Sequence, residues 1–194
     1  IGLTVAEAMI AQGQTRIALL SRGAFPVREM WQKVLQNSAP QDGIARRIRA
    51  VQKLEAAGGE VLVVQGDVSN VEDMRRVVRD VGETLGEIRG VIHGAGVIHD
   101  APIVGKSLND IEAVFTPKIH GTRVLDSIFP DGALDWFVVF SSNSTVTAPA
   151  GQVDYVAANE YLNAFAKARA GGKTKVLAID WGIWGDVGMA ADAM

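Results

Sequence analysis

The sequence predicts an α/β fold, in which a doubly wound parallel sheet is covered by helices on both faces. Two observations predict it. Short apolar segments alternate along the 194-residue chain with longer amphipathic segments, and this alternation is typical of βαβ units. Small, polar and glycine residues also follow each apolar segment, at the strand ends where parallel sheets bind ligands.

The first elements are a helix, a strand and an insertion. Apolar residues recur at helical spacing over residues 3–12 and stop at Gly13, which predicts a helix. The apolar run at 16–20 lies between polar residues and predicts a buried strand. Residues 24–43 are polar and bounded by prolines, and we expect an insertion there with a short helix at 28–35.

The middle of the chain repeats the alternation twice. Residues 44–57 are amphipathic and end at a glycine pair, as a helix does. The apolar run at 61–64 predicts the next strand, and residues 71–84 predict a helix with acidic residues in its first turn. Residues 88–93 predict a strand that leads into a glycine-rich turn.

The last third of the chain continues the pattern. Ser107 is placed to cap a helix that begins at Leu108 and runs into the 120s. Residues 135–140 predict a strand, residues 154–170 a helix and residues 176–179 the final strand.

The length predicts a single domain spanning residues 1–194. The chain opens directly into a helix, with Gly2 the only trace of a glycine-rich turn. A doubly wound sheet normally has a strand before that helix. We therefore expect a domain that lacks its first strand and glycine-rich phosphate loop and is incomplete at both ends.

Composition excludes several classes of function. The chain has no cysteine, which excludes disulfides, thiolate catalysis and cysteine–zinc sites. Its three histidines have no metal-ligand spacing, so we expect no metal. A net charge of −3 offers no basic field for nucleic acid. No uncharged apolar stretch is long enough to span a membrane, and we expect a cytoplasmic protein.

Ser21 and Arg22 follow the first predicted strand, where a dinucleotide fold reads the adenosine ribose. An acidic residue there would accept a hydrogen bond from the 2′-hydroxyl of NAD. A serine and an arginine instead offer donors to a 2′-phosphate, which favours NADP. A surface arginine after a strand is the alternative.

Two further strand ends carry residues suited to a nucleotide. Asp67 can accept a hydrogen bond from an adenine amino group, with the backbone of Val68 in reach, although an aspartate in a turn is equally ordinary. Gly94, Ala95 and Gly96 would let the backbone approach a sugar or pyrophosphate.

Four residues together are suited to acid–base chemistry at a carbonyl oxygen. Tyr155 and Asn159 lie four apart in a helical stretch and so share one face. An ammonium near Tyr155 would lower the pKa of the phenol, and Lys118 is the candidate. Ser142, at a strand end, is suited to hydrogen-bond a carbonyl oxygen. Taken singly, each of these residues is better explained by packing, a turn or a charged surface.

Together with their neighbours, these residues form short strings that match a known family, in the same order and over nearly the whole chain. The sequence resembles the ketoreductase domains of modular and iterative polyketide synthases, a branch of the short-chain dehydrogenases/reductases with a Rossmann-like fold. The strings that carry the resemblance are Leu19-Leu20-Ser21-Arg22, Gly66-Asp67-Val68, His93-Gly94-Ala95-Gly96-Val97, Pro117-Lys118-Ile119-His120-Gly121, Phe140-Ser141-Ser142, Gly151-Gln152, Tyr155-Val156-Ala157-Ala158-Asn159 and Asp180-Trp181-Gly182-Ile183-Trp184.

The resemblance implies a catalytic set of Tyr155, Ser142, Lys118 and Asn159. Most short-chain dehydrogenases place a lysine where this chain has Asn159, and in the polyketide branch the lysine and asparagine exchange positions. Lys118 lies 24 residues before Ser142, and Ser142 lies 13 before Tyr155, as in that branch. The resemblance also implies that Gly182 lines the nicotinamide pocket.

The implied activity is NADPH-dependent reduction of a β-ketoacyl thioester on an acyl carrier protein, within a multidomain megasynthase. Asp100 matches part of the marker of the subgroup that makes the D-3-hydroxyacyl product and so favours that product, while His99 departs from the marker and leaves the opposite product open. Residues 185–194 would begin a lid over the substrate. The alternatives are a non-reducing structural or docking domain, the equivalent reductase of a fatty acid or polyunsaturated fatty acid synthase, and a dehydrogenase acting on a free alcohol or sugar.

Overall fold

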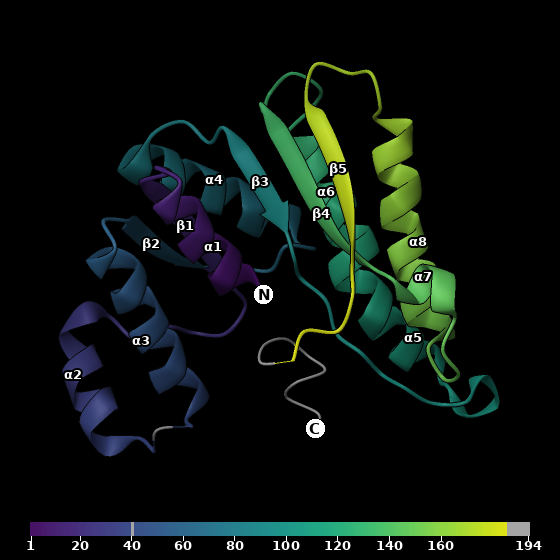
Figure 1. Ribbon diagram of the computed structural model, residues 1–194, viewed down its shortest axis with the longest axis horizontal. Helices are drawn as coiled ribbons and strands as arrows, with labels where there is room; N and C mark the ends of the chain where they lie inside the picture. The colour runs from purple at the N-terminus through teal and green to yellow at the C-terminus, as the bar shows by residue number, and fades with distance from the viewer. Residues whose placement is uncertain (40, 186–194) are drawn as a thin grey trace. The chain divides into compact units, whose positions relative to one another are not determined.

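The computed structural model describes residues 1–39 and 41–185 (Figure 1). The predicted lid therefore lies, apart from Gly185, outside the described residues. The chain divides into two compact units. The first unit contains residues 1–67 and 76–87, and the second contains residues 68–75 together with the chain from Ile88 onward.

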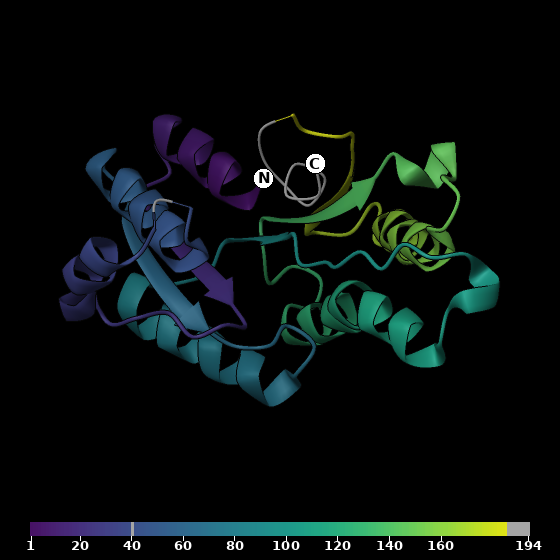
Figure 2. The same ribbon diagram turned by 90° about the horizontal axis from the view of Figure 1, so that it is seen from below.

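The first unit is built on two parallel strands. It contains α1 (Gly2–Ala11), β1 (Arg16–Ser21), α2 (Arg28–Asn37), α3 (Gly43–Ala56), β2 (Glu60–Gln65) and most of α4 (Val71–Leu85). Helices α1 and α3 lie on one face of the strand pair and α4 on the other (Figure 2). Ser21 pairs with Gln65, so β1 and β2 end side by side.

The amphipathic pattern of residues 44–57 is explained by the core of this unit. Ile48, Val51 and Leu54 of α3 are buried against α1 and β2. The N-terminus of α3 is capped by Asp42, whose carboxylate accepts hydrogen bonds from the amides of Ile44 and Ala45. This cap satisfies two of the amides that a helix start leaves without a partner.

The second unit is built on three parallel strands in the order β3-β4-β5. It contains β3 (Gly90–His93), η1 (Ile103–Gly105), α5 (Leu108–Phe115), η2 (Thr116–His120), α6 (Gly121–Ile128), β4 (Trp136–Ser142), α7 (Ser144–Thr147), α8 (Val153–Ala168) and β5 (Lys175–Trp181). Helices α5, α6 and α8 pack along one face of this sheet (Figure 2). The core of the unit includes Phe137 and Val139 of β4 and Leu162 of α8.

The predicted α/β class, with parallel strands and helices on both faces, is confirmed. The five described strands form two sheets, and no other described strand borders the remaining edges of β1 and β3. None of the described helices is both long and apolar enough to cross a lipid bilayer.

One element differs from its prediction. The helix expected from Leu108 into the 120s is three elements, because η2, between α5 and α6, is a π-helical turn. Pro117 lies in this turn and has no N–H to donate to the preceding carbonyl. Turns of this kind are often found at functional sites, and this one holds Lys118.

Candidate active site

The carboxyl ends of β4 and β5 form one edge of the second unit. Ser142, the last residue of β4, pairs with Trp181, the last residue of β5. The amide of Asn143 donates to the carbonyl of Trp181 at 3.0 Å, which continues the pairing past the strand end. Gly182 therefore follows Trp181 beside Asn143, whose Nδ2 would lie 3.8 Å from a Cβ at position 182.

Lys118 is held under this edge by η2. Its side chain is buried, with the residue only 3% exposed. The ammonium donates a hydrogen bond of 2.9 Å to the carbonyl of Phe140, two residues before Ser142. Nζ also lies 5.6 Å from the ring centroid of Tyr155, so lysine and tyrosine are neighbours as predicted.

Burial lowers the pKa of Lys118 to about 8. Removing an ammonium from water disfavours its charged form. Lys118 can therefore both donate and take up a proton close to neutral pH, which an exposed lysine does not readily do. A proton relay needs a group with this property.

Tyr155 and Asn159 lie on α8, and both are buried. The amide group of Asn159 donates from Nδ2 to the carbonyl of Tyr155 at 2.8 Å, while Ser141 of β4 donates to the carbonyl of Asn159 at 3.1 Å. The Oδ1 atom of Asn159 is fully buried and has no hydrogen-bond partner among the residues that the structure describes. A buried acceptor left open in this way is suited to receive a hydrogen bond from water or from a ligand.

The pKa of Tyr155 moves in the direction opposite to our expectation. Burial raises it, and the negative charge of Asp100 adds to the rise. Hydrogen bonding with Asn159 and Ser142 acts in the other direction but is the smaller effect. Burial is the largest effect, so Tyr155 is a protonated phenol in this site near neutral pH and can serve as a proton donor.

Ser142 is nearly buried at the end of β4, with 9% of its surface exposed. Its hydroxyl oxygen accepts a hydrogen bond of 3.1 Å from the amide of Ser144 at the start of α7. The hydroxyl proton remains available to donate, because a serine oxygen can accept and donate at once. The predicted set Lys118, Ser142, Tyr155 and Asn159 is thus gathered in one unit.

The glycines after β3 are required by close packing. A Cβ at position 94 would lie 3.0 Å from the ring of Phe140, and one at position 96 would lie 3.0 Å from Cε of Lys118. Ala95, between them, is exposed. Val68 is buried, and its Cγ1 would lie 2.9 Å from a Cβ on Gly121. Gly96 therefore packs directly against Lys118 of the predicted catalytic set.

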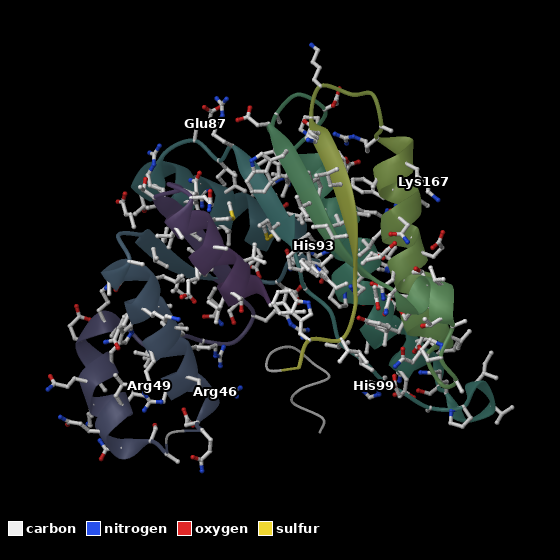
Figure 3. All side chains as sticks on the ribbon, in the orientation of Figure 1. Arg46, Arg49, Glu87, His93, His99 and Lys167 are labelled. Carbon is white, nitrogen blue, oxygen red and sulfur yellow. The ribbon has the colours of Figure 1, made fainter. Side chains whose placement is uncertain are left out.

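The sequence analysis did not assign His93 to the site. It is the last residue of β3 and lies in the interior of the second unit (Figure 3). Burial and the nearby positive charge of Lys118 lower the pKa of His93 to about 4, so the imidazole is neutral. His93 belongs to the string His93-Gly94-Ala95-Gly96, which contributes to the family resemblance. The string alone does not distinguish a structural histidine from a functional one.

The first unit holds the remaining predicted cofactor residues at one sheet edge. Ser21 ends β1, Arg22 follows it, and Asp67 lies two residues after the end of β2. The amide of Gly66 donates to the carbonyl of Ser21 at 3.1 Å, and Gln65 Nε2 donates to the carbonyl of Arg22 at 3.1 Å. Ser21, Arg22 and Asp67 are thus brought to the same edge.

Arg47 is a further residue that the sequence analysis missed. It belongs to the basic residues at positions 46, 47, 49 and 53 of α3, a pattern that is typical of a solvent-exposed helix face. The structure instead places Nη1 of Arg47 3.4 Å from the Ser21 hydroxyl oxygen, while Nε donates to the carbonyl of Gly43 at 3.1 Å. The run also contains Arg46 and Arg49 (Figure 3), and helical spacing alone did not single out Arg47.

The comparisons with known proteins agree with this geometry. A KR domain model matches residues 1–186. The chain belongs to the KR domain family. The KR chain is 33% identical over 192 residues to the 6-methylsalicylic acid synthase of Aspergillus terreus, covering 98% of the chain and 10% of that protein. It is 34% identical over 195 residues to a phenolphthiocerol/phthiocerol polyketide synthase of Mycobacterium tuberculosis, covering 100% of the chain and 10% of that protein.

Solved structures give the same result. An A-type ketoreductase structure from a modular polyketide synthase has a TM-score of 0.80 and 31% identity, covering 98% of this chain and 37% of that one. An N-terminal ketoreductase from the macrolactin assembly line has a TM-score of 0.79 and 32% identity, covering 94% of this chain and 34% of that one. The predicted resemblance is confirmed: this is a KR domain, similar in sequence and fold to the ketoreductase domains of polyketide synthases. The chain spans about a tenth of the length of the curated relatives it matches.

Proposed function

We propose that this KR domain reduces a β-ketoacyl thioester, carried by an acyl carrier protein, to the 3-hydroxyacyl thioester with NADPH in the cytoplasm. The neighbouring domains of a polyketide synthase supply the substrate and take the product. The single observation that supports the proposal most directly is the buried group of Lys118, Ser142, Tyr155 and Asn159 in the second unit. A surface role would not require an ammonium, a phenol and an amide to be withdrawn from water together.

The four side chains divide the chemistry among them. NADPH, when bound, supplies the hydride. Ser142 and Tyr155 donate hydrogen bonds to the ketone oxygen as negative charge develops there, and Tyr155 gives up its proton. The raised pKa of Tyr155 keeps that proton in place until the oxygen becomes basic. Lys118, with a pKa of about 8, returns a proton to the tyrosine, and the open Oδ1 of Asn159 orients water in the relay.

The first unit supports NADPH over NADH. A 2′-phosphate needs several fixed donors, and a guanidinium offers them in a planar fork. Arg22 follows the strand end, and Arg47 is held against the hydroxyl of Ser21. The edge where β1 and β2 end therefore offers a phosphate two guanidinium donors, Arg22 and Arg47. Neither position 21 nor position 22 carries an acidic side chain that would favour the 2′-hydroxyl of NAD.

The cofactor proposal is tested by binding. NADPH and NADH are titrated against the protein by cofactor fluorescence, with Arg22→Gln, Arg47→Gln and the control Arg79→Gln, which changes an exposed arginine of α4. We expect both test variants to weaken NADPH binding at least about tenfold and to leave NADH binding unchanged, because a charged hydrogen bond contributes roughly 1.5–3 kcal/mol. Equal losses for both cofactors would contradict a role in phosphate recognition.

The catalytic proposal is tested with Tyr155→Phe, using the chain's other tyrosine in Tyr161→Phe as the matched control. We expect Tyr155→Phe to abolish NADPH oxidation by a β-ketoacyl thioester while NADPH binding persists, and Tyr161→Phe to retain both. Near-parental turnover in Tyr155→Phe would overturn the mechanism. Absence of turnover in the parent protein despite NADPH binding would favour a non-reducing structural domain.

A further inference from the structure

A buried ion pair lies directly beside Tyr155. The ammonium of Lys106, in the segment between η1 and α5, contacts the carboxylate of Asp154 at 2.8 Å. Each of these side chains is 1% exposed. A pair so completely withdrawn from water is costly to form and is strongly destabilised when one partner is removed.

Asp154 connects the pair to the catalytic tyrosine. It is the residue before Tyr155 in the first turn of α8, and its Oδ1 accepts a hydrogen bond of 2.9 Å from the amide of Tyr155. The N-cap residue, Gln152, makes no side-chain cap of its own. Asp154 therefore stabilises the start of α8 at the residue that carries the phenol.

Lys106 connects the same carboxylate to the segment after β3. Its ammonium also donates to the carbonyl of His99, which lies in that segment six residues past the end of β3 (Figure 3). Two further bonds join this segment to the turn before α8. Gln152 donates to the carboxylate of Asp100 at 2.8 Å, and the amide of Ala101 donates to the carbonyl of Gly151 at 3.1 Å.

We propose that Lys106 is a positioning residue, which neutralises the Asp154 carboxylate and so holds Tyr155 in its working place and charge state. Without the ammonium, a buried negative charge would remain one residue from the phenol. That charge would oppose formation of the phenolate and would also pull Asp154 toward water, away from the Tyr155 amide. The inference rests on the proposed catalytic role of Tyr155.

The chain permits a direct test, because it has only two tyrosines, Tyr155 and Tyr161. In a Tyr161→Phe background, the ultraviolet absorbance of the tyrosinate reports the pKa of Tyr155 alone. Three variants are titrated in this background: Lys106→Met, the double variant Lys106→Met with Asp154→Asn, and Lys167→Met, which removes an exposed lysine of α8 as the control (Figure 3).

We expect Lys106→Met to raise the pKa of Tyr155 by about one pH unit, because an unpaired carboxylate disfavours the phenolate. The double variant should return it to the parental value, since the asparagine side chain is neutral and its amide oxygen can still accept from the Tyr155 amide. Turnover should follow the same order, with kcat reduced in Lys106→Met and largely restored in the double variant. The KM for NADPH should stay constant throughout.

A merely structural pair predicts that Lys106→Met loses stability while the pKa of Tyr155 stays at the parental value. An unchanged pKa in Lys106→Met, or a raised pKa that the double variant does not restore, would overturn the proposal. If Lys106→Met fails to fold by circular dichroism, a folded double variant with the parental pKa supports the proposal, and a shifted pKa in the double variant overturns it. The absorbance titration does not depend on turnover, so failure of the proposed function would leave this test intact.

Discussion

Lys118→Met is the variant whose energetics follow most directly from the structure. The ammonium of Lys118 is buried, and its pKa falls from 10.5 to about 8. That difference means that burying the charged form costs about 3 kcal/mol. Below pH 8 the lysine is protonated in both the folded and unfolded states, so the folded protein bears the whole cost. Above pH 10.5 it is neutral in both states, and the cost disappears.

The sign of the pH dependence follows from proton binding. Between pH 8 and 10.5 the unfolded chain holds a proton at Lys118 that the folded protein has released, so this residue makes the folded state more stable as the pH rises. Methionine has no such proton. We therefore expect the free energy of unfolding of the parent, relative to that of Lys118→Met, to increase by about 3 kcal/mol between pH 8 and pH 10.5.

The assay is urea unfolding of the parent and Lys118→Met at several pH values from 7 to 10.5. Taking the difference between the two proteins cancels the contributions of the titrating groups that Lys118 does not influence. Lys167→Met, which changes an exposed lysine, should show a constant difference from the parent. A constant difference for Lys118→Met as well would refute the reasoning, because it would mean that the buried lysine has an ordinary pKa. Turnover should be lost at every pH.

Three other predictions concern packing and charge in the second unit. Gly96→Ala should lower kcat by about tenfold or more, since its Cβ would displace Lys118, whose Cε lies 3.0 Å away; unchanged steady-state kinetics would contradict this. The parent should lose about 3 kcal/mol of stability relative to His93→Gln as the pH falls from 6.5 to 4, because His93 stays neutral only when folded; denaturant unfolding across that range measures it. Gly90→Ala should destabilise the protein by about 2 kcal/mol or more, because its Cβ would lie 2.1 Å from the Trp136 ring; a thermal midpoint equal to the parent's would contradict the clash.

The strands and most helices could be predicted because their signals are local. β2 and α3 show why: a run of apolar residues and a glycine pair mark their ends without reference to the rest of the chain. The η2 turn could not be predicted in this way. Proline at position 117 indicates a break, but whether the helix ends there or widens into a π-turn depends on the packing of its neighbours.

Sequence spacing predicts which candidate residues share a helix face. It does not predict contacts that form only when distant parts of the chain fold together. Tyr155 and Asn159 share a face because they lie four apart on α8, a relation that the sequence contains. Arg47 approaches Ser21 from 26 positions along the chain, and Lys106 approaches Asp154 from 48. No periodicity connects residues at such separations, so their roles emerged only from the folded chain.

The rise in the pKa of Tyr155 has a similar origin. The expectation that Lys118 would lower it considered the charge of a neighbour and omitted the loss of water around both groups. In the structure burial acts on both, lowering the pKa of Lys118 to about 8 while raising that of Tyr155. The two shifts have one consequence for the chemistry: the phenol keeps its proton until the ketone oxygen becomes basic, and the amine has one to replace it. Burial therefore keeps the phenol protonated and makes the ammonium a readier proton donor, whereas an exposed lysine would hold its proton far more tightly.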